Sequence, residues 1–318
     1  MPELKIITMS DVKRRKITYL WEQYIALGSI TLILGNGGTG KSWLSLAIAS
    51  AVTTGKTLPG SDNALPPSHV IIQNTENDIE TVISHRLDIL GADCSKIHSI
   101  DVTDEPLSLT DERIEAAIKQ FNAKLFIADP LQAHLLGNIS MNRAESIRPA
   151  FMHLSKVAER TNCSIILVGH LNKSRGASQY RGLGSVDIIN SVPSALYVGV
   201  TDKENGVRAI VHGKANFNEQ GASQSFRLTK KGGFEWLGEC GATIEDVVSG
   251  DTAGRMSKLE IASEFLRDAL AEEAMTSVEL AALAKENGIK FATLKRARES
   301  MGVEARKVNG RWQTILNE

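Results

Sequence analysis

The sequence has few of the features that mark secreted, metal-binding or membrane proteins. Its 318 residues contain three cysteines, Cys94, Cys163 and Cys240, which lie far apart and form no CxxC pair. An odd number of cysteines at such spacing argues against a disulfide framework and against a structural zinc site. The first residues form no apolar signal-peptide core, and no run reaches the about 18 apolar residues that a membrane span needs. We therefore expect a cytoplasmic protein without a membrane partner.

The charge balance is also close to neutral. The formal net charge is −1, with 42% hydrophobic and 23% charged residues, as in ordinary soluble globular proteins. Any affinity for nucleic acid must then come from local basic patches rather than from the whole molecule. The length allows one large α/β domain together with a small module.

The most informative pattern that is present is Gly-Asn-Gly-Gly-Thr-Gly-Lys-Ser at residues 35–42, a complete GxxxxGK[ST] phosphate loop. Its glycines permit positive φ and let backbone N–H groups approach a phosphate, Lys41 supplies a positive charge, and the Ser42 hydroxyl is suited to Mg²⁺. An apolar run precedes the loop and an Ala-rich helical stretch follows it, as this motif requires. We expect ATP and Mg²⁺ as cofactors, and these nucleotide-binding residues: Gly35, Asn36, Gly37, Gly38, Thr39, Gly40, Lys41, Ser42 and Trp43.

The chain from residue 30 to about residue 237 alternates short apolar runs with amphipathic stretches. This alternation predicts an α/β fold whose mainly parallel sheet is covered by helices on both faces. The last two runs follow without intervening helices, which suggests an antiparallel extension. The expected strands are Ile30–Leu34, His69–Gln73, Lys124–Ala128, Ser164–Gly169, Ala195–Val200 and Arg208–His212, and the expected helices are Trp43–Val52, Ile79–Leu90, Arg113–Phe121 and Ile147–Arg160.

The pattern changes near the C-terminus. Residues 243–257 have little apolar periodicity and are expected to link a core of residues 1–242 to a small domain of residues 258–318. In the small domain, the spacing predicts three helices, the second opened by a capping box of Thr276 and Glu279. A hairpin is expected to turn at Asn309-Gly310. Three helices followed by a hairpin indicate a winged-helix-like domain.

Two acidic residues follow predicted strands, where open α/β sheets place their ligands. Asp129 ends the run that begins at Leu125, and it is expected to hold Mg²⁺ opposite Ser42 rather than merely to begin a turn. Glu76 follows the strand that ends at Gln73 and is the expected catalytic base for the attacking water. Asp78 is the alternative base, although it is also suited to cap the next helix.

His170 ends a third run and is the expected sensor of the γ-phosphate, with an ordinary buried histidine as the alternative. The residues after it read NKSRGASQYRGLGSVD (172–187), and we expect Lys173, Arg175 and Arg181 to contact the backbone of single-stranded DNA. An ordinary surface loop is the alternative. Lys214 follows a late strand, where a cation can complete the ATP site of a neighbouring subunit, as arginine fingers do, and an ordinary exposed lysine is the alternative.

The small domain separates its charges, with residues 258–283 acidic and residues 285–311 basic. Its third helix and hairpin would form one basic face for duplex DNA, with Lys295, Arg296 and Arg298 as candidate contacts. Winged helices also serve as protein–protein adaptors, so this alternative remains open.

With these motifs in place, the sequence resembles the RecA-like ATPases of the RepA type, hexameric replicative helicases of plasmids, phages and prophages. The resemblance runs from residues 17–21 to the terminal segment. It implies a RecA-like ring with ATP sites between subunits. It also implies Lys41 and Ser42 as the Walker A pair, Glu76 as the catalytic glutamate, Asp129 as Walker B and His170 as the sensor. Residues 214–216 resemble the family's KxN or KxR element, and the trans-acting cation is then Lys214, Arg208 or Arg181.

With this resemblance, we expect an oligomeric, hexameric, Mg²⁺-ATP-driven motor on single-stranded DNA, most simply a replicative helicase. An ATP-switched initiator, loader or regulator that binds duplex DNA without unwinding it is the main alternative. A filament-forming recombinase is a third hypothesis, because these proteins share one core.

Overall fold

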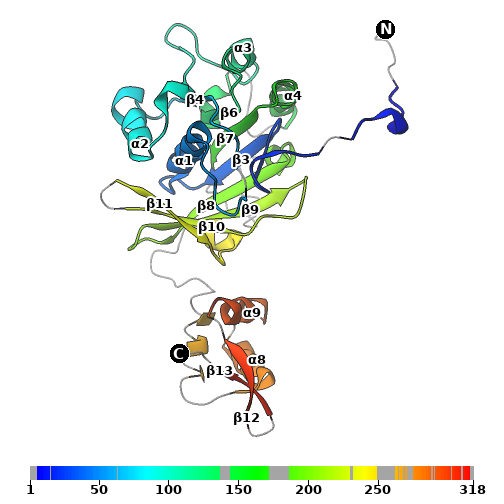
Figure 1. Cartoon of the computed structure of the whole chain (residues 1–318), viewed down its shortest axis with the longest axis vertical. Helices are drawn as coiled ribbons and strands as arrows, with labels where there is room; N and C mark the ends of the chain where they lie inside the picture. Colours follow the sequence, from blue (N-terminus) through cyan, green and yellow to red (C-terminus); the bar gives the residue numbers. More distant parts are fainter. Residues whose placement is uncertain are drawn as a thin grey trace.

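A computed structural model shows an α/β core followed by a small helical unit (Figure 1). The structure describes residues 6–14, 16–62, 64–136, 144–171, 186–229, 232–248, 262–263, 265–267, 269–270, 275–287, 289, 291–301, 303–308 and 311–315. No helix within these ranges is long and apolar enough to cross a membrane.

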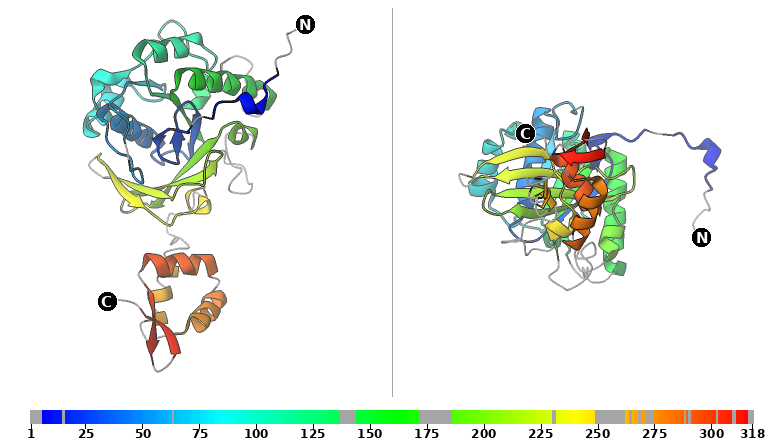
Figure 2. Two further views of the ribbon diagram at one scale, coloured as in Figure 1. Left: turned by 45° about the vertical axis from the view of Figure 1, so that its right-hand side comes forward. Right: turned by 90° about the horizontal axis from the view of Figure 1, so that it is seen from below.

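The N-terminal residues form an arm that leaves the core. Residues 6–14 and 16–18 are exposed, with one short 3-10 turn, η1 (Met9–Asp11). The chain enters the core at a small hairpin of β1 (Tyr19–Trp21) and β2 (Ile25–Ala26). Figures 1 and 2 show the arm extending away from the rest of the molecule.

A nine-stranded sheet forms the centre of the core, in the order β11-β10-β9-β8-β3-β7-β6-β4-β5. The six strands from β8 to β5 are parallel, and β9, β10 and β11 extend the sheet in antiparallel fashion. The expected mainly parallel sheet with an antiparallel extension is therefore confirmed. The strands are β3 (Ile30–Gly35), β4 (Val70–Asn74), β5 (Ile97–His98), β6 (Leu125–Asp129), β7 (Ser164–His170), β8 (Ser194–Asp202), β9 (Val207–Ala215), β10 (Gln224–Leu228) and β11 (Phe234–Glu239).

Helices cover both faces of this sheet because side chains alternate along each strand. In β3, Leu32 and Leu34 face one apolar cluster and Ile33 faces the other. The Ile33 face is covered by α1 (Lys41–Thr54) and α2 (Ser84–Ile89), the second of which continues a single π-helical turn, η2 (Ile79–Ile83). The other face is covered by α3 (Glu112–Phe121), α4 (Ala144–Thr161), α5 (Val186–Asn190) and α6 (Ile244–Val248).

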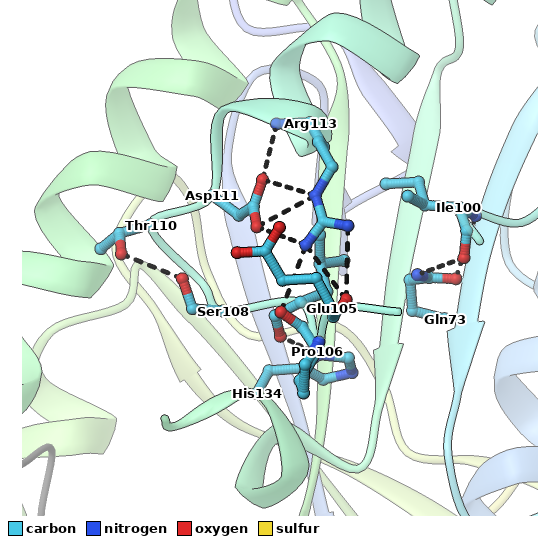
Figure 3. A network of polar contacts seen from close by, with 10 residues as sticks. Gln73, Ile100, Glu105, Pro106, Ser108, Thr110, Asp111, Arg113 and His134 are labelled. Atoms are coloured by element: carbon cyan, nitrogen blue, oxygen red, sulfur yellow. Dashed lines mark hydrogen bonds and ion pairs between the residues drawn. The ribbon is translucent and has the colours of Figure 1, made fainter. Parts of the chain in front are cut away.

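The segment between β5 and α3 is fastened to the sheet by polar contacts (Figure 3). A short 3-10 turn, η3 (Cys94–Lys96), leads into β5, and the segment starts where β5 ends. The buried Gln73 amide donates to Ile100 O at 3.1 Å and accepts from Ile100 N at 3.2 Å. Further along, Arg113 donates to the carbonyl oxygens of Glu105 and Pro106. These side-chain contacts satisfy backbone groups of this irregular segment.

A second anchor of the same segment comes from the turn that follows β6. This turn is η4 (Leu131–His134), and the buried His134 Nδ1 lies 2.9 Å from Leu107 O. Leu109 N returns a bond to His134 O at 3.1 Å. The segment between β5 and α3 is therefore held against the carboxyl ends of β4 and β6.

The expected linker differs from the structure at its beginning. Residues 244–248 of the predicted 243–257 linker form α6, in which Val247 and Val248 are buried. Thr243 opens this helix, with its N–H and hydroxyl both donating to Asp246 Oδ2. Short helices with two adjacent valines show little helical periodicity, which is why the sequence suggested an irregular segment. The remainder of the expected linker lies outside the described residues.

The C-terminal unit has its own small apolar cluster. Residues 262–263, 265–267 and 269–270 are helical, and α8 (Ser277–Glu286) and α9 (Phe291–Ser300) follow. A hairpin of β12 (Glu304–Val308) and β13 (Arg311–Ile315) ends the unit. The expected capping box is confirmed, because Glu279 N donates to Thr276 Oγ1 and Thr276 N donates to Glu279 Oε2. The buried cluster consists of Ala262, Leu266, Leu280, Ala284, Leu294 and Ala297.

Candidate nucleotide-binding site

The phosphate loop connects the end of β3 to the start of α1. Gly38 and Gly40 have φ values of 74° and 92°, a conformation that glycine adopts without strain. At Gly35 the requirement is spatial, since a Cβ there would lie 2.2 Å from Val198 O. The loop thus directs its backbone N–H groups and the N-terminus of α1 toward one point, an arrangement suited to phosphate.

Lys41 occupies the centre of this loop. It is 5% exposed, and its ammonium donates to Gly35 O at 3.0 Å and to Asn36 O at 2.8 Å. Burial lowers the pKa of Lys41 to about 8, although the nearby Asp129 and Glu76 carboxylates act in the opposite direction. Because the pKa of Lys41 is lowered in this way, a negative charge placed beside the ammonium would raise that pKa again.

His170 connects Lys41 with Glu76. Its Nδ1 lies 3.3 Å from Lys41 Nζ, and its Nε2 lies 3.2 Å from Glu76 Oε1. An ammonium group can only donate, so Nδ1 is the accepting nitrogen and Nε2 carries the proton that is shared with Glu76. The structure therefore brings Lys41 of the phosphate loop together with two residues that the sequence placed at separate strand ends, Glu76 and His170.

Asp129 lies beside this chain of contacts. It is 3% exposed, and its Oδ2 accepts from Asn74 Nδ2 at 3.1 Å. Burial raises the pKa of Asp129, and a hydrogen bond from Ser42 opposes this change. The carboxylate and the Ser42 hydroxyl are thus adjacent, as the sequence predicted for a Mg²⁺ site.

The turn that carries Glu76 is held by its neighbours. Asn74 Oδ1 accepts from Asn77 N at 2.7 Å, which closes the turn that contains Glu76. Asp78 Oδ1 accepts from Thr81 N at 2.8 Å, so the interpretation of Asp78 as a helix cap is confirmed. Since the Asp78 carboxylate is engaged in capping, Glu76 is the carboxylate that faces the phosphate loop.

Sequence reasoning missed Arg86. This residue lies on α2 with its guanidinium carbon 5.1 Å from the centroid of the Trp43 ring. Burial lowers the pKa of Arg86, and the Asp129 carboxylate opposes this change. Together with the phosphate loop, Glu76, Asp129 and His170, Arg86 lines a cavity of about 300 Å³. No motif surrounds Arg86 in the sequence, so only the packing of α2 against α1 reveals it.

The three candidate trans-acting cations have different positions. Arg208, on β9, packs beside the phosphate loop of its own chain. A Cβ atom added at Gly40 would lie 3.2 Å from Arg208 Cδ. Lys214 Nζ donates to Ile189 O and Asn190 O at the end of α5. Arg181 lies outside the described residues, as do Lys173 and Arg175, so their predicted contacts remain predictions.

The three basic residues that the sequence suggested as contacts to duplex DNA lie on α9. Lys295 and Arg296 are exposed and Arg298 is half-buried, while Lys295 Nζ lies 3.9 Å from Glu299 Oε1. The expected DNA contact of this helix remains a prediction.

The residues present are compatible with a nucleotide-associated metal ion. Within the described ranges no three His, Cys, Asp or Glu side chains gather closely enough to hold an ion by themselves. Mg²⁺ takes one or two protein ligands together with phosphate oxygens and water. The buried Asp129 carboxylate and the Ser42 hydroxyl are such ligands.

Comparison with known families is consistent with this site. The sequence pattern of the AAA domain family matches residues 4–176, which is more than half of the chain. The chain belongs to the AAA domain family. This region contains all three phosphate-loop partners, Glu76, Asp129 and His170, so the core is an AAA-type P-loop ATPase domain. The family suggests ATP-driven motor activity. No significant match was found among curated proteins.

Proposed function

We propose that this AAA domain protein is an oligomeric, Mg²⁺-dependent ATPase that moves on single-stranded DNA, most simply a replicative helicase of the RepA type. Lys41 binds the β- and γ-phosphates, and Ser42 and Asp129 hold Mg²⁺. Glu76 orients and deprotonates the attacking water. The bound metal ion would neutralise the charge of the phosphates.

The contact chain from Lys41 through His170 to Glu76 is the observation that carries this proposal. His170 is the last residue of β7, and the basic segment 172–187 begins two residues later in the sequence. Loss of the γ-phosphate from Lys41 would change the hydrogen bonds of His170, and that change would reach the adjoining segment. A switch connected in this way to Lys173, Arg175 and Arg181 is what a DNA-translocating ATPase needs.

The proposed motor activity can be tested with DNA substrates. We expect ATP turnover by the full chain to rise when single-stranded DNA is added, and a forked duplex to be unwound. The Lys41→Ala variant is the matched control and should do neither. An ATPase rate that is unchanged by single-stranded DNA, in a protein that stays monomeric with nucleotide, would exclude the motor.

The C-terminal unit favours a second candidate, an ATP-switched initiator, loader or regulator. Its three helical segments and hairpin follow the order of a winged helix, and α9 carries Lys295, Arg296 and Arg298. This candidate predicts sequence-specific binding to duplex DNA that is lost when residues 255–318 are deleted. It also predicts that a forked substrate is left intact.

A further inference from the structure

The N-terminal arm exposes large apolar side chains that nothing in the described structure covers. Ile6, Ile7 and Met9 are 80%, 76% and 79% exposed, and Val12 is also exposed. Four such residues within seven positions, on a segment that extends from the core, form an apolar strip that is unfavourable in water. The basic residues Lys13 and Arg14 follow the strip directly.

A groove of complementary character lies on the core, between α2 and the carboxyl ends of β4 and β5. It is a cavity of about 220 Å³ whose apolar lining includes Ile72, Ile83, Leu87 and Ile97. Ile79 lies at its rim and is 51% exposed. The acidic residues near the groove, Glu80 on η2 and Asp88 on α2, are both exposed. The groove therefore presents the apolar surface and the negative charge that the arm would require.

We propose that the arm of one copy of this chain docks into the η2–α2 groove of a neighbouring copy. Ile6, Ile7 and Met9 would enter the groove, and Lys13 and Arg14 would lie against Glu80 and Asp88. Figures 1 and 2 show the arm leaving the core on the side opposite α2, the helix that borders the groove. The contact is therefore head-to-tail, and repeated contacts of this kind close into a ring or extend as a filament.

The groove also adjoins the catalytic turn, which connects assembly with hydrolysis. Asn74 and Ile79, which line the groove, flank the turn that contains Glu76. Asn74 closes that turn through Asn77 N and donates to Asp129. An arm that fills the groove would thus stabilise the position of the Glu76 carboxylate, so full ATP turnover would require a neighbour.

A disulfide trap tests this contact in the full chain. Cys94 lines the groove and is exposed, whereas Cys163 is buried. With diamide as oxidant and a non-hydrolysable ATP analogue present, we expect Ile7→Cys to give a ladder of cross-linked chains on a non-reducing gel. Adding Cys94→Ser should abolish the ladder. The position control is Met152→Cys, because Met152 is exposed on α4 over the opposite face of the sheet.

A second measurement uses the charges and apolar residues of the arm. We expect Ile6→Asp with Ile7→Asp to shift the mass measured by light scattering toward a single chain, while binding of the analogue is retained. Lys13→Glu with Arg14→Glu should also weaken assembly, and Glu80→Lys with Asp88→Lys should restore it. Residues 6–14 are exposed in the described part of the chain, so variants of the arm should fold.

The proposed arm contact rests on the proposed oligomer but not on its DNA substrate. Different results would therefore contradict the arm contact and the proposed function. If an oligomer with DNA-stimulated turnover formed no Ile7–Cys94 ladder, the arm contact would be overturned and the proposed function would stand. If the protein stayed monomeric with nucleotide, the arm contact and the proposed oligomer would both be wrong.

Discussion

The imidazole of His170 lies between Lys41 and Glu76, with Nδ1 3.3 Å from the ammonium and Nε2 3.2 Å from the carboxylate. One side chain thus contacts both the group that binds phosphate and the group that would activate water. Because the ammonium can only donate, the direction of the hydrogen bonds is fixed from Lys41 to Glu76. The site is therefore a connected unit rather than three independent residues.

Replacing His170 tests this connection. We expect His170→Ala to lower kcat by about tenfold or more while ATP binding is retained, since a hydrogen bond to a charged group contributes about 1.5–3 kcal/mol. His170→Gln can still accept and donate, so it should lose less. Single-turnover hydrolysis and a fluorescent-nucleotide titration measure the two effects. Equal losses in both variants would contradict the hydrogen-bonded connection, because glutamine would then restore nothing that alanine removes.

The role of the base is tested with the two neighbouring carboxylates. Glu76→Gln should bind ATP normally and hydrolyse it about 100-fold more slowly or worse, as for removal of a general base. Asp78→Asn is the matched control, because it changes a helix cap and should cost at most about 1 kcal/mol of stability. Normal hydrolysis by Glu76→Gln would move the base to another residue.

The lowered pKa of Lys41 predicts a pH dependence of nucleotide binding. The ammonium is present below its pKa of about 8 and is lost as the pH rises through that value. Bound phosphates raise the pKa, so ATP affinity should fall about tenfold between pH 7 and pH 9, with protons taken up on binding. Calorimetry in buffers of different ionisation enthalpy measures this uptake. Lys41→Arg, whose charge persists, should show neither effect.

His212 predicts a pH dependence of stability. It accepts from Gly221 N at 3.0 Å and lies 3.2 Å from the Ser194 hydroxyl, which in turn donates to Tyr24 O. Burial lowers the pKa of His212 to about 4, so the folded protein keeps it neutral.

The sign of the effect follows from comparison with the unfolded chain. Below the ordinary histidine pKa of about 6.5 the unfolded chain takes up a proton that the folded chain does not, so stability is lost as the pH falls. Between pH 7 and pH 5 the loss should be about 2 kcal/mol. Urea unfolding of wild type and His212→Gln checks this, and identical pH slopes would contradict it.

Much of the site could be predicted because its residues follow strands with clear patterns. The phosphate loop, Asp129 and His170 each end an apolar run, and parallel strands bring such ends to one edge. Arg86 could not be predicted, since it reaches the site only through the packing of α2 beside Trp43.

Other features depend on contacts between distant parts of the chain. Tyr24 contacts Ser194 and His212, which lie 170 and 188 positions further along the chain, and no local pattern indicates these contacts. The helix at residues 244–248 is similar, because it is recognisable only from the burial of Val247 and Val248 against the sheet.

The central claim is that the phosphate loop binds and cleaves ATP, and Mg²⁺-dependent turnover of wild type beside Lys41→Ala tests it most directly. We predict hydrolysis by wild type that requires Mg²⁺ and a loss of nucleotide binding in Lys41→Ala. A wild-type protein that bound no nucleoside triphosphate in the presence of Mg²⁺ would contradict the account.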